Sequence, residues 1–163
     1  GVWHFPATCG LKGTEIKELG ENMMENALLG PVLGQVAVTI LAFIMLFVRR
    51  IPALTSMKAT NAQLQDKANL ALLPDKAKFA GENYNHQFEM PVLFYVLCLG
   101  AMATGLGDAL TVQLAWAYVG LRLVHHVIHV TYNKVMHRFA VFMLSGLVIV
   151  AMFGQIAFKY WSI

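Results

Sequence analysis

Four long apolar segments alternate with shorter polar ones along this chain. The apolar segments cover residues 28–48, 83–106, 109–131 and 139–158. Each holds about 20 residues or more, which is the length a helix needs to cross a hydrocarbon core about 30 Å thick. The pattern therefore predicts an all-α fold: an integral membrane bundle of four transmembrane helices.

The polar connections give the expected ends of these helices. Arg49 and Arg50, followed by Pro52, are expected to end the first helix. A helix lying at the membrane surface could form over residues 59–73 of the next connection. Residues 105–108 form a tight turn, so the second and third helices are expected to be antiparallel neighbours.

The N-terminal residues differ from the rest in kind. They combine glycines with charged side chains: Lys12, Glu15, Lys17, Glu18, Glu21 and Glu25. A cleavable leader would place basic residues before an apolar run, and this segment does not. We interpret residues 1–27 as a tail outside the bundle, with a short surface helix over 13–24, and residues 28–163 as the bundle domain.

Composition supports a membrane protein and excludes some functions. The chain is 58% hydrophobic and 13% charged, whereas soluble domains are about 45–50% apolar and about 25% charged. The net charge is +3, but no basic run with interleaved aromatic residues is present, so nucleic-acid binding is not expected. Cys9 and Cys98 lie in the tail and in an apolar run, which predicts neither a disulfide nor a metal-binding pair.

The basic residues predict an orientation. The connection after the first span carries Arg49, Arg50, Lys58, Lys67, Lys76 and Lys78. The turn before the fourth span carries Lys134 and Arg138, and the turn at 105–108 carries no basic residue. By the positive-inside rule, the two basic connections face the cytoplasm and both termini lie outside.

A polar stripe marks the third span. When each residue advances about 100° around a helix, Arg122, His125, His126, His129 and Asn133 share an arc of about 100°. A charge facing lipid costs about 2.5 kcal/mol or more. The stripe must therefore face other helices or a wet cavity, and it is the first place to look for function.

Further polar residues belong to the same end of the bundle. They lie at the start of the second span and at the turn before the fourth: Asn83, Asn85, His86, Glu89, Lys134, His137 and Arg138. On a helix, Asn85 and His86 are spaced to meet Glu89. We also expect an ion pair between Glu89 and Arg122, which would neutralise both charges.

Three interpretations of these residues are open. Polar side chains can simply hold membrane helices together. His125 and His129 are one helical turn apart, as metal ligands often are, but there is no HExxH motif, cysteine pair or second histidine pair. We therefore predict no metal or haem site.

The third interpretation is a site for an anionic ligand, because Arg122, Lys134 and Arg138 can bind carboxylates. Arg138 would also lie in the first turn of a helix, whose dipole favours a thiolate.

Two motifs resemble a known family. Residues 83–95 (NYNHQFEMPVLFY) and 115–125 (AWAYVGLRLVH), with Asn133 and Arg138, resemble the bacterial branch of MAPEG, the membrane-associated proteins in eicosanoid and glutathione metabolism. The resemblance covers about residues 28–160. It implies a homotrimer that binds glutathione between subunits near the cytoplasmic side. Family members are glutathione transferases, peroxidases or isomerases of lipophilic electrophiles, and one relative is a non-catalytic lipid-binding partner protein.

The resemblance also assigns roles to residues. It implies that Arg138 is the catalytic, thiolate-stabilising arginine and that Arg122 binds the glutathione peptide. The other implied ligand-binding residues are His125, His129, Glu89, His86, Asn85, Asn133 and Lys134. Two departures stand out: the second-span motif lacks the arginines of the eukaryotic enzymes, and His129 stands where the family has tyrosine.

The sequence thus predicts a glutathione-dependent transferase or peroxidase acting on lipophilic substrates in the membrane, with glutathione as its cofactor. The expected location is a bacterial inner membrane, with the polar site toward the cytoplasm and lipids as neighbours. The alternative is a non-catalytic lipid-binding protein or an accessory subunit of a larger membrane complex.

Overall fold

A computed structural model describes residues 13–57 and 72–162. These residues form helices joined by turns: α1 (Gly13–Ser56), α4 (Asp75–Asn85), the 3₁₀ helix η1 (His86–Phe88), α5 (Met90–Thr104), α6 (Ala109–Val130) and α7 (Val135–Trp161). The predicted all-α bundle is confirmed. The surface helix predicted over 59–73 lies almost wholly outside the described residues.

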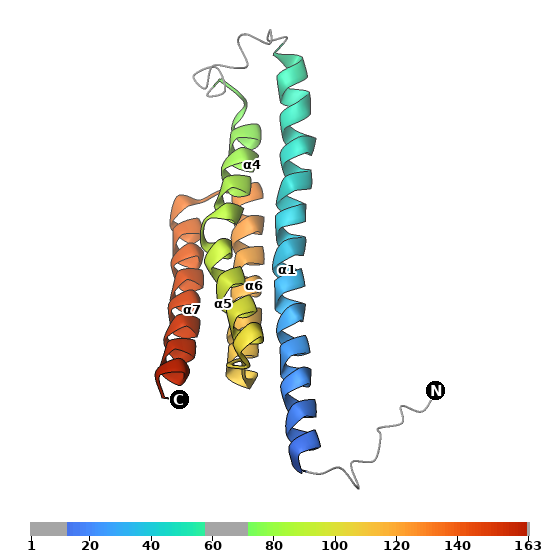
Figure 1. The fold of residues 1–163 in the computed structure, drawn as a ribbon. Coiled ribbons are helices and arrows are strands. Elements are labelled where there is room, and N and C mark those ends of the chain that lie inside the picture. Colours follow the sequence, from blue (N-terminus) through green and yellow to red (C-terminus); the bar gives the residue numbers. More distant parts are fainter. Residues whose placement is uncertain (1–12, 58–71, 163) are drawn as a thin grey trace, which may run out of the picture.

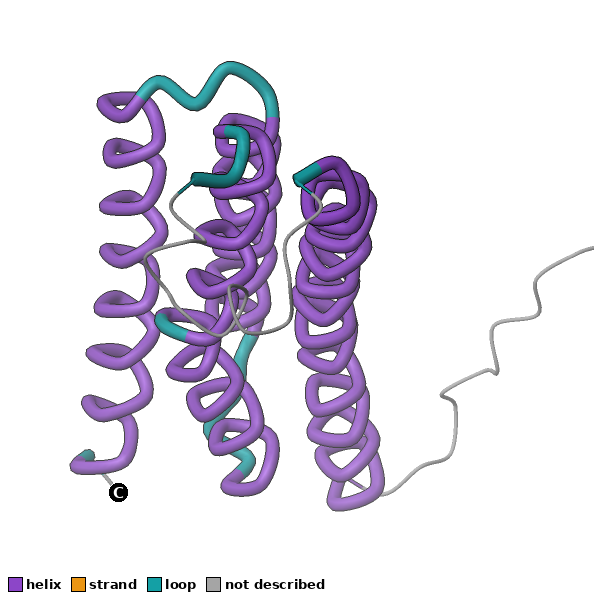
Figure 2. Tube along the Cα trace, turned by 90° about the horizontal axis from the view of Figure 1, so that it is seen from above, coloured by secondary structure: helices purple, strands orange, loops and turns teal. Residues whose placement is uncertain are grey.

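The helices form a bundle in which α1 and α7 lie on opposite sides (Figures 1 and 2). Both α5 and α6 pack against α1 and against α7. As predicted, α5 and α6 are antiparallel and joined by a short turn, but their main helix contacts are with α1 and α7. They meet across the core, where the ring of Phe94 stacks on that of Tyr118 at a centroid distance of 4.6 Å. Both rings are fully buried.

Three stretches of the described residues are long and apolar enough to cross a membrane: Ala27–Ser56, Asp75–Thr104 and Val135–Trp161. The third predicted span, α6, is not among them because its arginine and histidines lower its mean hydropathy. It nevertheless has 22 residues, which corresponds to about 33 Å of helix. It runs alongside the others as the fourth member of the bundle (Figure 1).

Helix α1 is longer than predicted and extends past the other helices at both ends (Figure 1). The prediction that Arg50 and Pro52 end it is wrong, since the helix continues through both. Beyond Pro52, Ala53 packs in a small apolar cluster with Leu73 and Ala77 next to α4. This packing stabilises the last turn and outweighs the hydrogen bond that a proline removes.

At its other end, α1 begins at Gly13 and runs on without a break. The predicted surface helix over 13–24 is therefore helical, but it is the first part of α1 and not a separate element. The division into a tail and a bundle at residue 28 stays a prediction.

The second span is broken where the sequence suggested one continuous helix over 83–106. Helix α4 ends at Asn85, a 3₁₀ turn follows, and Glu89 has non-helical dihedral angles of φ −93° and ψ −95°. Pro91 is the cause, because it lacks an N–H and its ring clashes with the carbonyl of the residue four positions earlier, Gln87, so it fits only at the start of a new helix. The break leaves backbone carbonyl groups inside the bundle that need partners from other helices.

The turn between α5 and α6 is tied to the end of α7. Asp108 is the N-cap of α6 and shares a reciprocal capping box with Thr111. Its carboxylate also accepts hydrogen bonds from Gln155 at 2.6 Å and Lys159 at 2.6 Å. Burial alone would raise the pKa of Asp108, but the bonds from Lys159, Thr111 and Gln155 hold that pKa well below its ordinary value.

We expect Asp108→Ala to lower the free energy of unfolding by about 1–2 kcal/mol near pH 7, because it removes the cap and the partner of Lys159. A depressed folded-state pKa gives stability that is present above the unfolded carboxyl pKa of about 3.9 and is lost as the pH falls below it. The deficit should therefore shrink below about pH 4 in thermal unfolding in detergent. Asp108→Asn keeps a capping oxygen and should cost less. If Asp108→Ala loses the same free energy of unfolding near pH 7 and below about pH 4, the ionised Asp108 carboxylate does not stabilise the fold.

Two glycines let α1 approach α6 closely. A Cβ atom on Gly30 would lie 3.2 Å from the Trp116 ring, and one on Gly34 would lie 3.3 Å from Val119 and 3.4 Å from Trp116. Small residues at such spacing allow membrane helices to pack tightly. Trp116 thus fills a shallow channel on α1 that any larger residue would close.

We expect Gly34→Leu to destabilise the bundle by about 1–3 kcal/mol, because the new side chain overpacks the α1–α6 contact. Gly154→Leu is the matched control, since a Cβ atom there has no neighbour within 4 Å. Unfolding in detergent micelles titrated with dodecyl sulfate measures both variants. Equal stability of the two would show that the close approach is dispensable.

Candidate functional site

The polar stripe of α6 is buried, as predicted. Arg122, His125, His126 and His129 are exposed to 0%, 2%, 5% and 0%. They do not share one partner helix, however. His125 and His129 contact Arg138 of α7, whereas His126 contacts α4. The residues that form one stripe on α6 therefore contact two different helices.

A pocket of about 170 Å³ lies on the α7 side of the stripe, between η1, α6 and α7. It is lined by His86, His125, Val135, Arg138, Phe139 and Phe142. The ring of His86 lies 6.1 Å from that of His125 and 5.9 Å from that of His129, measured between centroids. The His125 and His129 rings are 5.8 Å apart. Two histidines and one arginine thus line this pocket, and His129 lies next to both histidines.

Arg138 links the parts of this site. It lies in the first turn of α7, as predicted. Its Nη1 donates hydrogen bonds to His129 Nε2 at 3.2 Å and to Asn133 Oδ1 at 3.1 Å, and it lies 3.6 Å from a carboxylate oxygen of Glu82. Its backbone carbonyl lies 3.3 Å from His125 Nδ1. The guanidinium is therefore held in place while its side chain stays 23% exposed.

Asn133 reaches Arg138 from a different position than the sequence suggested. It does not continue the helix but lies in the turn after α6, with φ 45°. Asparagine tolerates this left-handed conformation better than most residues. Its N–H bonds the carbonyl of Ile128 at 2.9 Å, which closes the end of α6.

Arg122 is the largest fully buried side chain among the described residues. Its Nη2 donates a 2.6 Å hydrogen bond to the carbonyl of His86, at the break between α4 and α5. Its Nε and Nη1 have no hydrogen-bond partner among the described residues. The arginine thus satisfies a carbonyl in the broken helix and retains donors that are free to bind another group.

The predicted Glu89–Arg122 ion pair is wrong. Glu89 instead accepts a 2.9 Å hydrogen bond from Nδ1 of His86, three residues earlier, as the His86–Glu89 spacing predicted. The helix break explains both results, because it presents a backbone carbonyl to Arg122 and leaves the Glu89 side chain 55% exposed.

The other predicted ligand-binding residues lie outside the pocket. Asn85 and Lys134 are exposed and do not line it. Asn85 does not pair with Glu89 because α4 ends between them. His137 is exposed, and its ring lies 3.3 Å from the hydroxyl of Tyr132, away from the pocket residues.

A second polar network lies on the side of the stripe that faces α4 and α1. Asn83 Nδ2 lies 2.7 Å from His126 Nδ1, and Gln35 Nε2 donates to Gln87 Oε1 at 3.2 Å. All four side chains are buried. Neither Gln35 nor Gln87 was predicted from the sequence to be a site residue. The signal for Gln35 was present, since it is a lone amide in the uncharged first span.

The histidines do not form a metal centre in the described part of the chain. No group of three histidine, cysteine, aspartate or glutamate side chains there has an arrangement suited to a metal ion. Arg138 at the centre of the cluster also opposes a bound cation electrostatically. The residues present suit an anion better.

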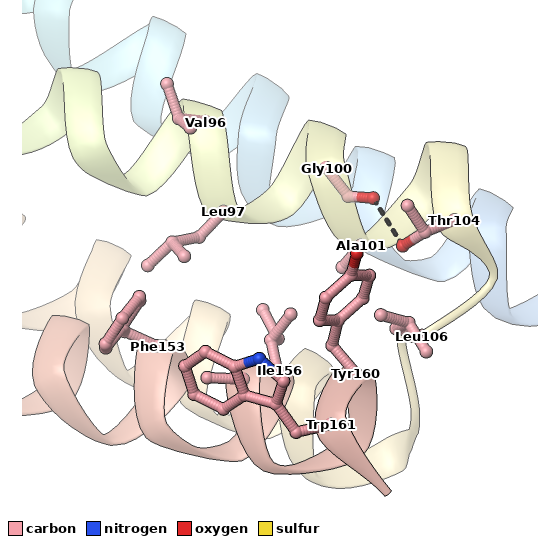
Figure 3. A pocket seen from close by; sticks show the side chains of 11 residues that line it. Val96, Leu97, Gly100, Ala101, Thr104, Leu106, Phe153, Ile156, Tyr160 and Trp161 are labelled. Carbon is pink, nitrogen blue, oxygen red and sulfur yellow. Dashed lines mark hydrogen bonds between the residues drawn. The ribbon is translucent and has the colours of Figure 1, made fainter. Parts of the chain in front are cut away.

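An apolar groove of about 380 Å³ lies at the other end of the bundle, between α5 and α7 (Figure 3). Its walls are formed by Val96, Leu97, Gly100, Ala101, Thr104, Leu106, Phe153, Ile156, Ala157, Tyr160 and Trp161. Tyr160 and Trp161 lie at the end of α7, where aromatic residues commonly mark the membrane interface. The groove has the size and character of a site for a hydrocarbon chain.

Comparison with known families supports this description. The model of the MAPEG family matches residues 28–158, which include the four bundle helices and both motifs noted in the sequence. Comparisons with curated proteins and with solved structures gave no match. The family match covers most of the chain, and the family is a four-helix membrane bundle. The chain is therefore an integral membrane protein that belongs to the MAPEG family.

Proposed function

We propose that the protein is a glutathione-dependent transferase or peroxidase of lipophilic substrates. The observation that carries this proposal is Arg138, which lines the pocket with His86 and His125. A guanidinium in the first turn of a helix combines its own charge with the helix dipole. Both stabilise a thiolate, which is the nucleophilic form of a thiol.

The donors at the site fit glutathione, which carries two carboxylates. Charged hydrogen-bond donors bind carboxylates well. Arg122 does not line the pocket, but it contacts His86, which does, and its Nε and Nη1 have no partner among the described residues. The pocket of about 170 Å³ is smaller than the roughly 300 Å³ expected of a complete small-molecule site. The remainder of the ligand would lie against a neighbouring subunit, and we propose a homotrimer that completes the site.

In this mechanism, Arg138 holds the sulfur and stabilises its negative charge. The aromatic rings of Phe139 and Phe142 shield the sulfur from water. Val135 and Phe139 are exposed and apolar, so a lipophilic substrate could reach the pocket from the bilayer between them. The same thiolate would attack an electrophilic carbon in a transferase or a peroxide oxygen in a peroxidase.

We also propose that the protein lies in a bacterial inner membrane with this site toward the cytoplasm. The end of the bundle that carries the site also carries Arg49, Arg50, Lys76, Lys78 and Lys134. The turn at 105–108 at the other end has no lysine or arginine. This asymmetry follows the positive-inside rule.

A second candidate function is non-catalytic lipid binding, within or outside a larger membrane complex. The groove between α5 and α7 favours it, because the groove is apolar, lies far from the histidines and is larger than the pocket (Figure 3). It could hold an acyl chain with no chemistry at all.

One experiment separates the two candidates. The full chain, purified in a mild detergent, is tested with millimolar glutathione for a rise in Tm and for turnover of an aryl halide and an organic hydroperoxide. A rise in Tm with turnover of either substrate supports the enzyme. No rise and no turnover would end that proposal, and a co-purified lipid or a fixed set of other subunits would then favour the second candidate.

A further inference from the structure

We propose that His86, oriented by Glu89, is the base that removes the proton from the attacking thiol. This inference rests on the proposed function and adds a second catalytic group to it. Arg138 can stabilise a thiolate once it has formed, but a guanidinium cannot accept a proton. A separate acceptor at the same pocket would speed the removal of the proton near neutral pH.

The contact with Glu89 gives His86 the right tautomer. An ionised carboxylate only accepts hydrogen bonds, so the 2.9 Å contact between Glu89 Oε2 and His86 Nδ1 places the proton on Nδ1. The lone pair is then on Nε2. Histidines that act as general bases use this arrangement: a carboxylate contacts one imidazole nitrogen, and the other nitrogen has a free lone pair.

The backbone also holds His86 in position. Its carbonyl accepts the 2.6 Å hydrogen bond from the buried Arg122. The residue lies in the short 3₁₀ turn η1, which the helix break creates. In this position its ring lines the same pocket as Arg138. The acceptor and the thiolate-stabilising group therefore come from different helices to one cavity.

The neighbouring histidines are less suited to this role. Nε2 of His129 lies 3.2 Å from Arg138 Nη1, so its lone pair accepts that hydrogen bond. His125 is buried, and its Nδ1 faces the carbonyl of Arg138. No carboxylate among the described residues contacts His125, so only the carbonyl of Arg138 would compensate the charge that it would gain as a base.

The charged groups around His86 suit a proton transfer. Arg138 faces it from α7, and His125, His129 and Arg122 face it from α6. Its own segment contributes Glu89, and Glu82 lies beside Arg138. After transfer, the imidazolium of His86 is next to Glu89 and the thiolate is next to Arg138. Each new charge therefore has a partner of opposite sign.

The reaction balances without any further reactant. With an aryl halide, Nε2 of His86 takes the thiol proton, and the sulfur lone pair forms the bond to the ring carbon. The carbon–halogen bond then breaks and the halide leaves with its electron pair. His86 releases the proton to solvent, and the products are the thioether, the halide and one proton.

The test uses the pH dependence of conjugation by the full chain. His86→Gln is expected to lower kcat/KM by up to about 30-fold near pH 7, because only about 3% of a thiol with an ordinary pKa of about 8.5 is ionised there without a base. The loss should nearly vanish near pH 9, because such a thiol, and still more one whose thiolate Arg138 stabilises, is then mostly ionised without a base. A variant that merely disturbed the fold would lose the same factor at every pH.

Three companion variants sharpen the result. Glu89→Gln should give a smaller loss with the same pH dependence, and imidazole added to His86→Ala should restore part of the rate. His137→Gln is the matched control and should behave as wild type.

A loss of kcat/KM in His86→Gln that does not depend on pH, or no loss, overturns the role of His86 while glutathione still raises Tm. If the wild-type chain shows neither a Tm rise nor turnover, the proposed function itself has failed.

Discussion

Arg138→Ala is expected to lower the rate of thiol conjugation by about 100- to 1,000-fold, the range seen when one donor that stabilises a developing negative charge is removed. Arg138 is the only permanently charged side chain that lines the pocket in the described part of the chain. Its loss removes the stabilisation of the thiolate and leaves only the dipole of α7. The expected result is a fall in kcat at saturating glutathione.

The measurement is steady-state conjugation, together with the ultraviolet absorbance of the bound thiolate. Arg138→Lys keeps the charge but not the two-pronged geometry, so its rate should fall between wild type and alanine. Arg50→Ala is the matched control, because the Arg50 guanidinium lies next to Gly81 of α4 and does not line the pocket. A full rate in Arg138→Ala would show that the thiol is activated elsewhere.

Arg122→Ala is expected to be the most destabilising single change, with a loss of about 3–5 kcal/mol in the free energy of unfolding. Arg122 is fully buried, so its truncation leaves a cavity. It also leaves the carbonyl of His86 without its 2.6 Å hydrogen bond. An unpaired carbonyl in apolar surroundings adds to the cost.

Arg122→Met separates these contributions. Methionine fills much of the space but cannot donate, so its remaining deficit should be about 1–3 kcal/mol, the cost of the orphaned carbonyl. Unfolding titrations in mixed micelles measure both variants. If Arg122 also binds a carboxylate of glutathione, Arg122→Met should lose the rise in Tm with glutathione. If the Tm of Arg122→Met still rises with glutathione, the role of Arg122 is only structural.

The hydrophobic pattern predicted α6 almost to its ends, because apolar length and the turn residues that flank it agree. It failed at Pro52, where the last turn of α1 depends on packing against Leu73 and Ala77. That contact joins segments far apart in sequence, and no local signal reveals it. The break at Glu89 was missed for a different reason. The effect of Pro91 was visible, but it competed with a strongly apolar run on its C-terminal side.

The candidate site was predicted in part. The rule that charges avoid lipid placed Arg122 and the three histidines of α6 inside the bundle, and all four are buried. The rule says nothing about which helix each side chain contacts. Arg122 therefore received the wrong partner, since a backbone carbonyl exposed by a helix break cannot be read from residue types. Gln35 was overlooked because a single amide in an apolar span is a weak signal.

The hydrogen bond from Arg122 to the carbonyl of His86 makes these two residues thermodynamically coupled. A ligand that drew the guanidinium away would leave that carbonyl unpaired and shift the imidazole that belongs to the same residue. Binding of a ligand to Arg122 would then change the position of the His86 ring, and the position of that ring would change how Arg122 binds the ligand. This coupling would hold although the two side chains lie on different helices.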